Sequence, residues 1–441
     1  MRVRRPARHR RRLGRHFSRL WTGVTLASSG DGILYGAVPL LALTVDPHPF
    51  AISAVVAADL APWLLMALPA GVFADRFHRG SVATVANGFR GVVVLMAALI
   101  VLDGRMTLMW LLLVVVLNAS ARAVYYSSAQ AMIPDVVHPE LLENANGALL
   151  GAEYGAEQLA GPVAGSWLFT LSQSVPFFTD TVVLISSCLP FARFRTGTKK
   201  AAENEGGTPE RAESSHSPWE GIRVLFSDPD LRVLVVLVAS LSGLQGMESG
   251  VLVLLATTLW GVREGAYGLF LAIGATGSML GSVATSGVVT RFGSARTLIG
   301  AALLSGVAYL VMVPANSWLV AGPAFVLLGL ATGIGSVVAT TVRQRLTPRD
   351  LMGRVGGAWR GVVWGVAPLG ALAAGVLASI GGLRLPLLLA GALQCAVALG
   401  LARPLARRIR DTPRGPSTTS GARHAKVSPE RVAAAKTLGR V

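Results

Sequence analysis

The sequence predicts an all-α membrane protein with twelve transmembrane helices arranged as two six-helix bundles. The chain has 441 residues, of which 52% are hydrophobic and only 14% are charged. This balance is too apolar for a soluble protein of that size. Apolar windows of about 19 residues recur twelve times, and each can cross a bilayer core of roughly 30 Å at about 1.5 Å per residue. A polar segment separates the first six windows from the last six.

The twelve spans follow one another closely along the chain. The first six lie near residues 21–45, 50–72, 82–103, 106–128, 147–171 and 176–195. The second six lie near residues 231–257, 266–290, 295–314, 317–341, 356–379 and 384–404. Most connections are short, so neighbouring spans are expected to run in opposite directions. Almost no room is left for a domain outside the membrane.

Changes in composition divide the chain into five regions. A basic tail, residues 1–20, precedes the first bundle, residues 21–195, and the second bundle covers residues 231–404. The linker between them, residues 196–230, begins with a polar run that predicts a flexible segment. Its end, from Trp219 to Phe226, alternates polar and apolar residues at helical spacing, which predicts a short helix on the membrane surface. Residues 405–441 are rich in basic residues, Ser, Thr and Pro, and are predicted to be disordered.

The net charge of +17 is concentrated beside the spans rather than in a domain that could bind nucleic acid. Arginines crowd the stretch from Arg2 to Arg19, and the even-numbered loops carry further basic residues such as Arg291 and Arg345. The opposite loops, such as Asp46 to Pro49, have little charge. The positive-inside rule therefore places both termini in the cytoplasm. We expect a multi-pass protein of the inner (plasma) membrane that contacts the lipid bilayer and no nucleic acid.

The residue types that build catalytic, metal or nucleotide sites are sparse. Cys188 and Cys395 both fall inside predicted spans, which indicates neither a disulfide framework nor a metal site. No phosphate-binding loop of the Gly-x-x-x-x-Gly-Lys-Ser/Thr kind occurs, so ATP is not expected to supply the energy. We expect no catalytic residues, no metal and no cofactor.

Ionisable residues inside the spans are the strongest candidates for function, because each costs roughly 2.5 to 3.5 kcal/mol at the bilayer centre. In the first half these are the acids Asp31, Asp59, Glu153 and Glu157 and the arginines Arg90 and Arg122. Asp31 and Asp59 lie near the middle of their spans, and the two glutamates share one face of span five. The arginines are expected toward the cytoplasmic side. The second half offers little beyond Glu248 and Arg360, so we place ion coupling in the first bundle.

Two interpretations apply to each acid. It can form a structural ion pair with one of the two arginines, or it can carry a proton, because burial in a partly dehydrated cavity favours the neutral carboxyl. We favour the proton-carrying role for Asp31 and Glu157, and both interpretations stay open for Asp59 and Glu153. Asp180, near the outer end of span six, is expected to make a helix-end or loop contact.

A short charged turn between spans two and three carries the first family signature. The turn runs from Gly71 to Arg79, and it resembles the loop signature Gly-x-x-x-Asp-Arg-x-Gly-Arg-Arg/Lys of the major facilitator superfamily. The matching residues are Gly71, Asp75, Arg76 and Arg79. His78 replaces the second glycine, and Gly80 replaces the final basic residue. The resemblance implies that this turn is a gating latch between the two bundles.

Span five carries the second signature. Gly161 and Gly165 form a small-xxx-small face for close helix packing, and Pro162 removes a helix hydrogen bond. The segment resembles the Gly-Pro-x-x-Gly signature of the antiporter branch of the same superfamily, from which Ser166 departs. We expect these residues to shape the interface between the bundles.

Further stretches resemble the bacterial exporter group that includes macrolide and enterobactin efflux proteins. They include Ser28 to Asp31, Ala129 to Asp135 and Gly353 to Arg360. Together these resemblances imply a monomeric secondary transporter that exports a mainly apolar, drug-like compound or secondary metabolite in exchange for protons. A proton-coupled importer on the same fold stays open, although span five argues against it. A membrane-embedded enzyme or receptor is a further alternative, but no polar catalytic cluster supports it.

Overall fold

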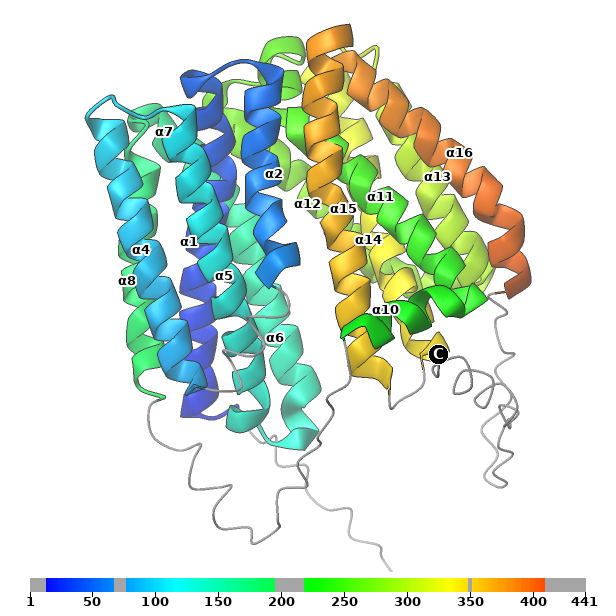
Figure 1. Cartoon of the computed structure of the whole chain (residues 1–441), viewed down its shortest axis with the longest axis horizontal. Helices are drawn as coiled ribbons and strands as arrows, with labels where there is room; N and C mark the ends of the chain where they lie inside the picture. The colour runs from blue at the N-terminus through cyan, green and yellow to red at the C-terminus, as the bar shows by residue number, and fades with distance from the viewer. Residues whose placement is uncertain (1–12, 67–76, 195–217, 348–350, 409–441) are drawn as a thin grey trace, which may run out of the picture. The chain divides into compact units, whose positions relative to one another are not determined.

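Helices make up all of the regular structure in the computed structural model, which describes residues 13–66, 77–194, 218–347 and 351–408. Within these ranges ten helices are long and apolar enough to cross a membrane, and Pro49–Trp63 is a shorter apolar helix. The helices gather in two groups, one coloured blue to green and the other green to orange (Figure 1). The prediction of an all-α membrane protein is confirmed.

The first half supplies its membrane crossings in the predicted order. Its helices are α1 (Arg15–Val45), α2 (Pro49–Met66), α4 (Arg79–Leu102), α5 (Leu108–Val136), α6 (Leu142–Tyr154), α7 (Gly161–Leu171) and α8 (Val175–Ala192). A 3₁₀ turn, η1 (Pro139–Leu141), precedes α6, and a π-helical segment, η2 (Gly155–Ala160), joins α6 to α7. Span five is therefore one path made of three helical pieces.

The second half begins with the short helix α10 (Pro218–Ser227), which covers the linker segment where a surface helix is predicted. The helices that follow are α11 (Pro229–Leu254), α12 (Tyr267–Phe292), α13 (Ser294–Met312), α14 (Trp318–Leu346), α15 (Met352–Gly381) and α16 (Arg384–Arg408). A π-helical segment, η3 (Leu255–Leu259), extends α11, and a 3₁₀ turn, η4 (Glu264–Ala266), precedes α12.

Several helices run past the apolar windows that predict them. α1 begins at Arg15 rather than at 21, and α5 continues to Val136 rather than ending at 128. The added part of α5 still buries Met132 and Ile133. A turn at the membrane surface needs only one apolar face, so a window of high mean hydropathy does not include it.

The largest cluster of buried apolar side chains crosses from one half to the other, and we call it the shared apolar cluster. It includes Leu41 and Ile52 from the first half and Trp260, Met312 and Ala374 from the second. Two smaller clusters each lie within one half. The shared cluster lies at the end of the bundles where α1 meets α2 and where α15 finishes, so the two halves are joined by apolar packing there.

Two helices of the first half, α2 and α7, make most of the contact between the halves. α2 packs against α15 and α11, and α7 packs against α12. On the first contact the buried hydroxyl of Ser53 donates a hydrogen bond of 2.9 Å to the carbonyl oxygen of Gly250. A Cβ added to Gly375 would lie 2.7 Å from the Cβ of Ser53, so the backbones approach closely. The lack of a side chain at Gly375 therefore allows α15 to meet α2.

Candidate transport site

Four charged side chains from four segments meet inside the first bundle, and we call them the charge cluster. They are Asp31 of α1, Arg90 of α4, Arg122 of α5 and Glu157 of η2. Arg90 donates a hydrogen bond to Asp31, and Arg122 donates one to Glu157. The Nε of Arg122 also lies 3.3 Å from Oδ2 of Asp31. Asp31 therefore bridges the two arginines, and the two positive charges balance the two negative ones.

One end of the charge cluster is dry. The side chains of Arg90 and Asp31 are 0% and 5% exposed. The Nε of Arg90 donates to Oδ1 of Asn118 at 3.0 Å, and its Nη1 donates to Oδ1 of Asn87 at 3.2 Å. Asn87 in turn donates to the hydroxyl of Ser187 at 2.9 Å. This buried pair has the additional hydrogen bonds that an ion pair needs in a medium of low dielectric constant.

The other end of the charge cluster is more open. The side chains of Arg122 and Glu157 are 19% and 26% exposed. Glu157 lies on η2, between the two straight parts of span five. π-helical segments interrupt the regular register of an α-helix and occur often at functional sites. The open acid of the cluster is therefore carried by the irregular piece of its span.

The two arginines lie near the middle of their helices. Arg90 of α4 and Arg122 of α5 are level with Asp31, which both of them contact. The structural ion pairs considered for Asp59 and Glu153 are not found among the described residues, where both acids are half-buried. The arginines pair instead with Asp31 and Glu157.

Asp180 differs from its expected helix-end contact. It lies inside α8, is fully buried, and has no hydrogen-bond partner for either oxygen among the described residues. A Cβ added to Gly30 would overlap its Oδ1, so this carboxyl packs directly against α1 beside Asp31. The distance of a residue from the end of a span does not tell which way its side chain points.

Glu248 of α11 is the buried acid of the second half. It is 4% exposed, and its Oε1 lacks a hydrogen-bond partner within the described ranges. The second bundle therefore also contains a buried carboxyl group, although ion coupling is predicted for the first. Among the residues that the structure describes, no group of three or more His, Cys, Asp or Glu side chains could hold a metal ion.

Only one residue of the predicted latch can be placed. Gly71, Asp75 and Arg76 lie outside the described residues. Arg79 begins α4, and its Nη1 lies 2.8 Å from Oδ2 of Asp135 and donates to the carbonyl oxygen of Ala131 at 2.7 Å. The basic end of the latch is thus tied to the last part of α5.

The glycines of the span-five motif bring α7 against α1. A Cβ on Gly161 would lie 2.5 Å from the Cα of Gly32, and one on Gly165 would overlap the carbonyl oxygen of Ile33. Neither position has room for a side chain without movement of a backbone. The predicted close packing therefore occurs within the first bundle.

The same segment also faces the second bundle. A Cβ on Gly268 of α12 would overlap the carbonyl of Pro162. The buried hydroxyl of Ser166 accepts a hydrogen bond of 3.0 Å from the backbone N–H of Gly268 and donates one of 3.1 Å to the carbonyl oxygen of Gly265. Ser166, where the chain departs from the antiporter signature, therefore makes polar contacts across the interface.

An aromatic contact, the aromatic bridge, links the charge cluster to the second half. The guanidinium of Arg122 lies 5.6 Å from the ring centroid of Trp63 on α2. The ring of Trp63 meets that of Trp364 on α15 edge to face, with centroids 5.4 Å apart. Such geometry is favourable for aromatic pairs and for a cation over a ring. Trp364 in turn lines a pocket in the second bundle.

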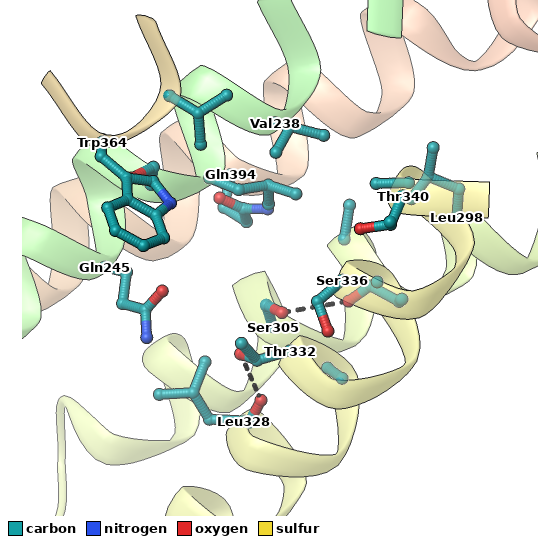
Figure 2. Close-up of a pocket in the computed structure, with 18 of the residues that line it drawn as sticks. Val238, Gln245, Leu298, Ser305, Leu328, Thr332, Ser336, Thr340, Trp364 and Gln394 are labelled. Carbon is teal, nitrogen blue, oxygen red and sulfur yellow. Dashed lines mark hydrogen bonds between the residues drawn. The ribbon is translucent and has the colours of Figure 1, made fainter. Parts of the chain in front are cut away.

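This pocket lies among α11, α13, α14, α15 and α16 and has a volume of about 360 Å³ (Figure 2). Serine, threonine, glutamine and aromatic side chains share its lining with aliphatic ones, and none of its lining residues is charged. The sequence does not reveal this pocket, because none of its lining residues is an ionisable group that stands out in an apolar span. The spacing of Gln245, Ser336 and Gln394 on separate spans gives no local signal.

Comparison with protein families decides what kind of protein contains these features. The model of the Major Facilitator Superfamily matches residues 20–259, which is more than half of the 441 residues. The chain belongs to the major facilitator superfamily. This superfamily member is a multi-pass membrane transporter of small molecules and not an enzyme.

Solved structures of transporters share the fold of this superfamily member. The nucleoside transporter NupG matches with a TM-score of 0.67 and 12% identity, over 90% of this chain and 100% of that one. A bacterial homologue of the iron transporter ferroportin in the inward-facing state matches with a TM-score of 0.68 and 18% identity, over 88% of this chain and 98% of that one. A bacterial homologue of the human lysosomal transporter Spinster in the inward-facing, occupied conformation matches with a TM-score of 0.69 and 16% identity, over 90% of this chain and 98% of that one. A comparison with curated proteins finds no match.

Proposed function

We propose that this superfamily member exports a mainly apolar, drug-like compound or secondary metabolite across the inner membrane in exchange for protons. The charge cluster is the observation that carries the proposal. Ionisable side chains are rare inside transmembrane helices and mark proton or substrate pathways where they occur. Here two acids and two arginines meet inside the first bundle, and Glu157 stays 26% exposed.

Glu157 is the acid best placed to exchange a proton. Arg122 is its ionic partner, and Arg122 also contacts Asp31. A proton on Glu157 would break one ion pair and leave Arg122 held by Asp31 alone. Arg122 also lies over Trp63. Proton binding in the first bundle would therefore change the contact of Arg122 with the aromatic bridge that leads to the second bundle.

The other predicted proton-coupling acids take supporting roles in this scheme. Asp31 holds both arginines at the centre of the cluster. Asp59 and Glu153, which are half-buried, supply further sites through which a proton can reach Glu157. The inward-facing state binds cargo while the acids are deprotonated. The two bundles then rock about the cavity between them, and protons from outside neutralise the acids and release the cargo from the outward-facing state.

The sequence signatures support the direction and the branch that we propose. The antiporter-like motif of span five and the exporter-like stretches favour a drug/proton antiporter, acting as a single chain with both termini in the cytoplasm. The pair formed by Arg79 and Asp135 is the described part of the latch. In this proposal the latch holds the bundles together on the cytoplasmic side during the outward-facing part of the cycle.

Efflux of a neutral apolar dye, Nile red, tests the proposal. Cells that express the protein should accumulate less dye than cells with an empty vector, and an uncoupler should abolish the difference. The Glu157→Gln variant, expressed at the same level, should behave like the empty vector. Efflux that persists after the proton gradient collapses while ATP remains would rule out proton exchange. Greater accumulation in expressing cells would indicate import.

A further inference from the structure

The pocket in the second bundle has the size and depth of a small-molecule site. Its volume of about 360 Å³ falls within the roughly 300 to 1,000 Å³ that is usual for such sites. The deep wall contains buried side chains, including Gln394 at 1% and Ser305 at 7% exposure. Other lining residues, among them Gln245, Ser336 and Trp364, are exposed. The lining therefore leads from an open rim to a closed polar end.

Gln394 provides an unused donor at the deep end. Its Nε2 is buried and has no hydrogen-bond partner among the described residues. In Figure 2 its side chain lies across the pocket from Ser305 and Ser336. Buried donors in folded proteins are almost always paired, so this amide calls for an acceptor from outside the described chain.

The opposite wall offers acceptors. The hydroxyls of Ser305, Thr332 and Ser336 donate to carbonyl oxygens of their own helices at 3.1, 2.9 and 3.0 Å. Each hydroxyl has only one proton, so each oxygen keeps a lone pair that can accept a hydrogen bond. The pocket therefore presents an N–H on one wall and hydroxyl oxygens on the other.

The lining also excludes charge. None of the residues around the pocket is Asp, Glu, Lys or Arg. An ion that entered would lose its hydration and find no opposite charge, which is far more unfavourable than burying a hydrogen-bonded neutral group. The aromatic rings of Trp359 and Trp364 and several aliphatic side chains favour an apolar body instead.

We propose that this pocket is a ligand site for a neutral molecule with an apolar body, a carbonyl-type acceptor that bonds Gln394 and an N–H or O–H donor that bonds the hydroxyl oxygen of Ser305. The site lies inside the second bundle, away from the charge cluster. The inference rests on the proposed function only in taking this molecule to be the exported compound. The cargo and the protons would then bind in different halves, with the aromatic bridge between them.

A binding experiment on the purified full-length protein in lipid nanodiscs tests the site. The probe is N-benzylacetamide, which is neutral and has one carbonyl and one N–H. Saturation-transfer NMR gives its dissociation constant without any proton gradient. Gln394→Leu should weaken binding roughly three- to tenfold, the range for loss of one hydrogen bond. The matched control is Gln344→Leu, which alters an exposed glutamine of α14 outside the pocket and should bind as the wild type does.

Two further comparisons test the exclusion of charge and the acceptor role of Ser305. The anionic analogue 3-phenylpropionate should bind the wild type at least about tenfold more weakly than the amide, because its charge has no partner in the pocket. Ser305→Ala should weaken binding of N-benzylacetamide but not of N-benzyl-N-methylacetamide, which has no N–H. This second variant preserves the test if Gln394→Leu lowers the melting temperature.

Equal affinities for the Gln394→Leu and Gln344→Leu variants, or equal affinity for amide and carboxylate, would overturn the proposed site. If Ser305→Ala weakens the binding of both amides equally, the proposed role of the serine is overturned. If binding depends on Gln394 but cells show no proton-driven efflux, the pocket stands and the proposed function fails. If efflux is proton-driven but binding ignores Gln394, the function stands and the pocket fails.

Discussion

Asp31 shows how one carboxylate can hold two cations in place within a membrane protein. Its side chain is 5% exposed, and its two oxygens contact Arg90 and Arg122. Glu157 contacts only the second of these arginines within the described chain and is 26% exposed. Removing one partner of a buried pair leaves an uncompensated charge, whereas removing the partner of an exposed group is screened by water. The two acids should therefore differ in their contribution to stability.

We expect Asp31→Asn to lower the free energy of unfolding by about 3 to 5 kcal/mol, because Arg90 then stays buried without its counter-charge. Glu157→Gln should lower it by about 1 kcal/mol or less, because Arg122 keeps Asp31 as a partner. Melting of the purified variants in detergent measures both. Glu143→Gln, at an exposed position of α6, is the control and should melt with the wild type. A melting temperature for Asp31→Asn as high as that for Glu157→Gln would contradict the assigned pairing.

The sequence identifies the members of the charge cluster but not their partners. Asp31, Arg90, Arg122 and Glu157 stand out because charged residues are rare in apolar spans. Which of them meet depends on the rotation and depth of four different helices, and nothing local in the sequence specifies that. The same holds for Asp180, because its position along α8 does not show that its side chain turns toward α1.

Span five shows what a hydropathy window cannot detect. The window near 147–171 predicts one continuous helix, whereas the structure has α6, η2 and α7. Pro162 cannot donate a backbone hydrogen bond, and its ring disfavours the regular turn before it. The irregular segment η2 lies just ahead of this proline and carries Glu157. The motif was recognisable in the sequence, but the change of helical register was not.

Gly165→Ala should destabilise the packing of α7 on α1. An added Cβ would overlap the carbonyl oxygen of Ile33, so a backbone must move. Overpacking of this kind typically costs about 1 to 3 kcal/mol, which exceeds the gain of up to about 1 kcal/mol from replacing glycine by alanine in a helix. Thermal unfolding of the variant should report the loss.

Gly151→Ala is the matched control on the same span, because a Cβ there meets nothing within 4 Å. It should be neutral or slightly stabilising through helix propensity alone. If both variants have the same melting temperature, the close approach of α7 to α1 does not determine stability. The span-five motif must then be explained otherwise.

At the scale of the whole molecule, the aromatic bridge connects the two halves of the proposed cycle. Trp63 contacts Arg122 of the charge cluster, and Trp364 lines the pocket of the second bundle. The fold itself was predictable because hydropathy is a local property of each span. The pocket was not, because uncharged side chains on five separate helices leave no pattern in the sequence.

If the bridge acts as a unit, Trp63→Leu and Trp364→Leu should each reduce substrate-induced proton release by a similar fraction, and the double variant should be no worse than either. The direct ring contact should appear as a coupling energy of roughly 0.5 to 1.5 kcal/mol in a double-mutant cycle. Proton release from proteoliposomes measures the fractions, and the unfolding free energies of the purified variants give the coupling energy. Trp318→Leu, at the exposed start of α14, serves as the control. Additive losses would show that the two rings act independently.

The shared apolar cluster makes the transport cycle sensitive to temperature. A state in which the halves part at that end must expose to water the apolar side chains of the cluster that pack between the halves. Exposure of apolar surface raises the heat capacity by about 0.45 cal/K/mol for each Å². The enthalpy difference between the two states should therefore change with temperature, so a van't Hoff plot of their populations from spin-label distances should be curved. The organism's growth temperature would then influence the resting balance between the states, even where proton gradient and cargo are unchanged.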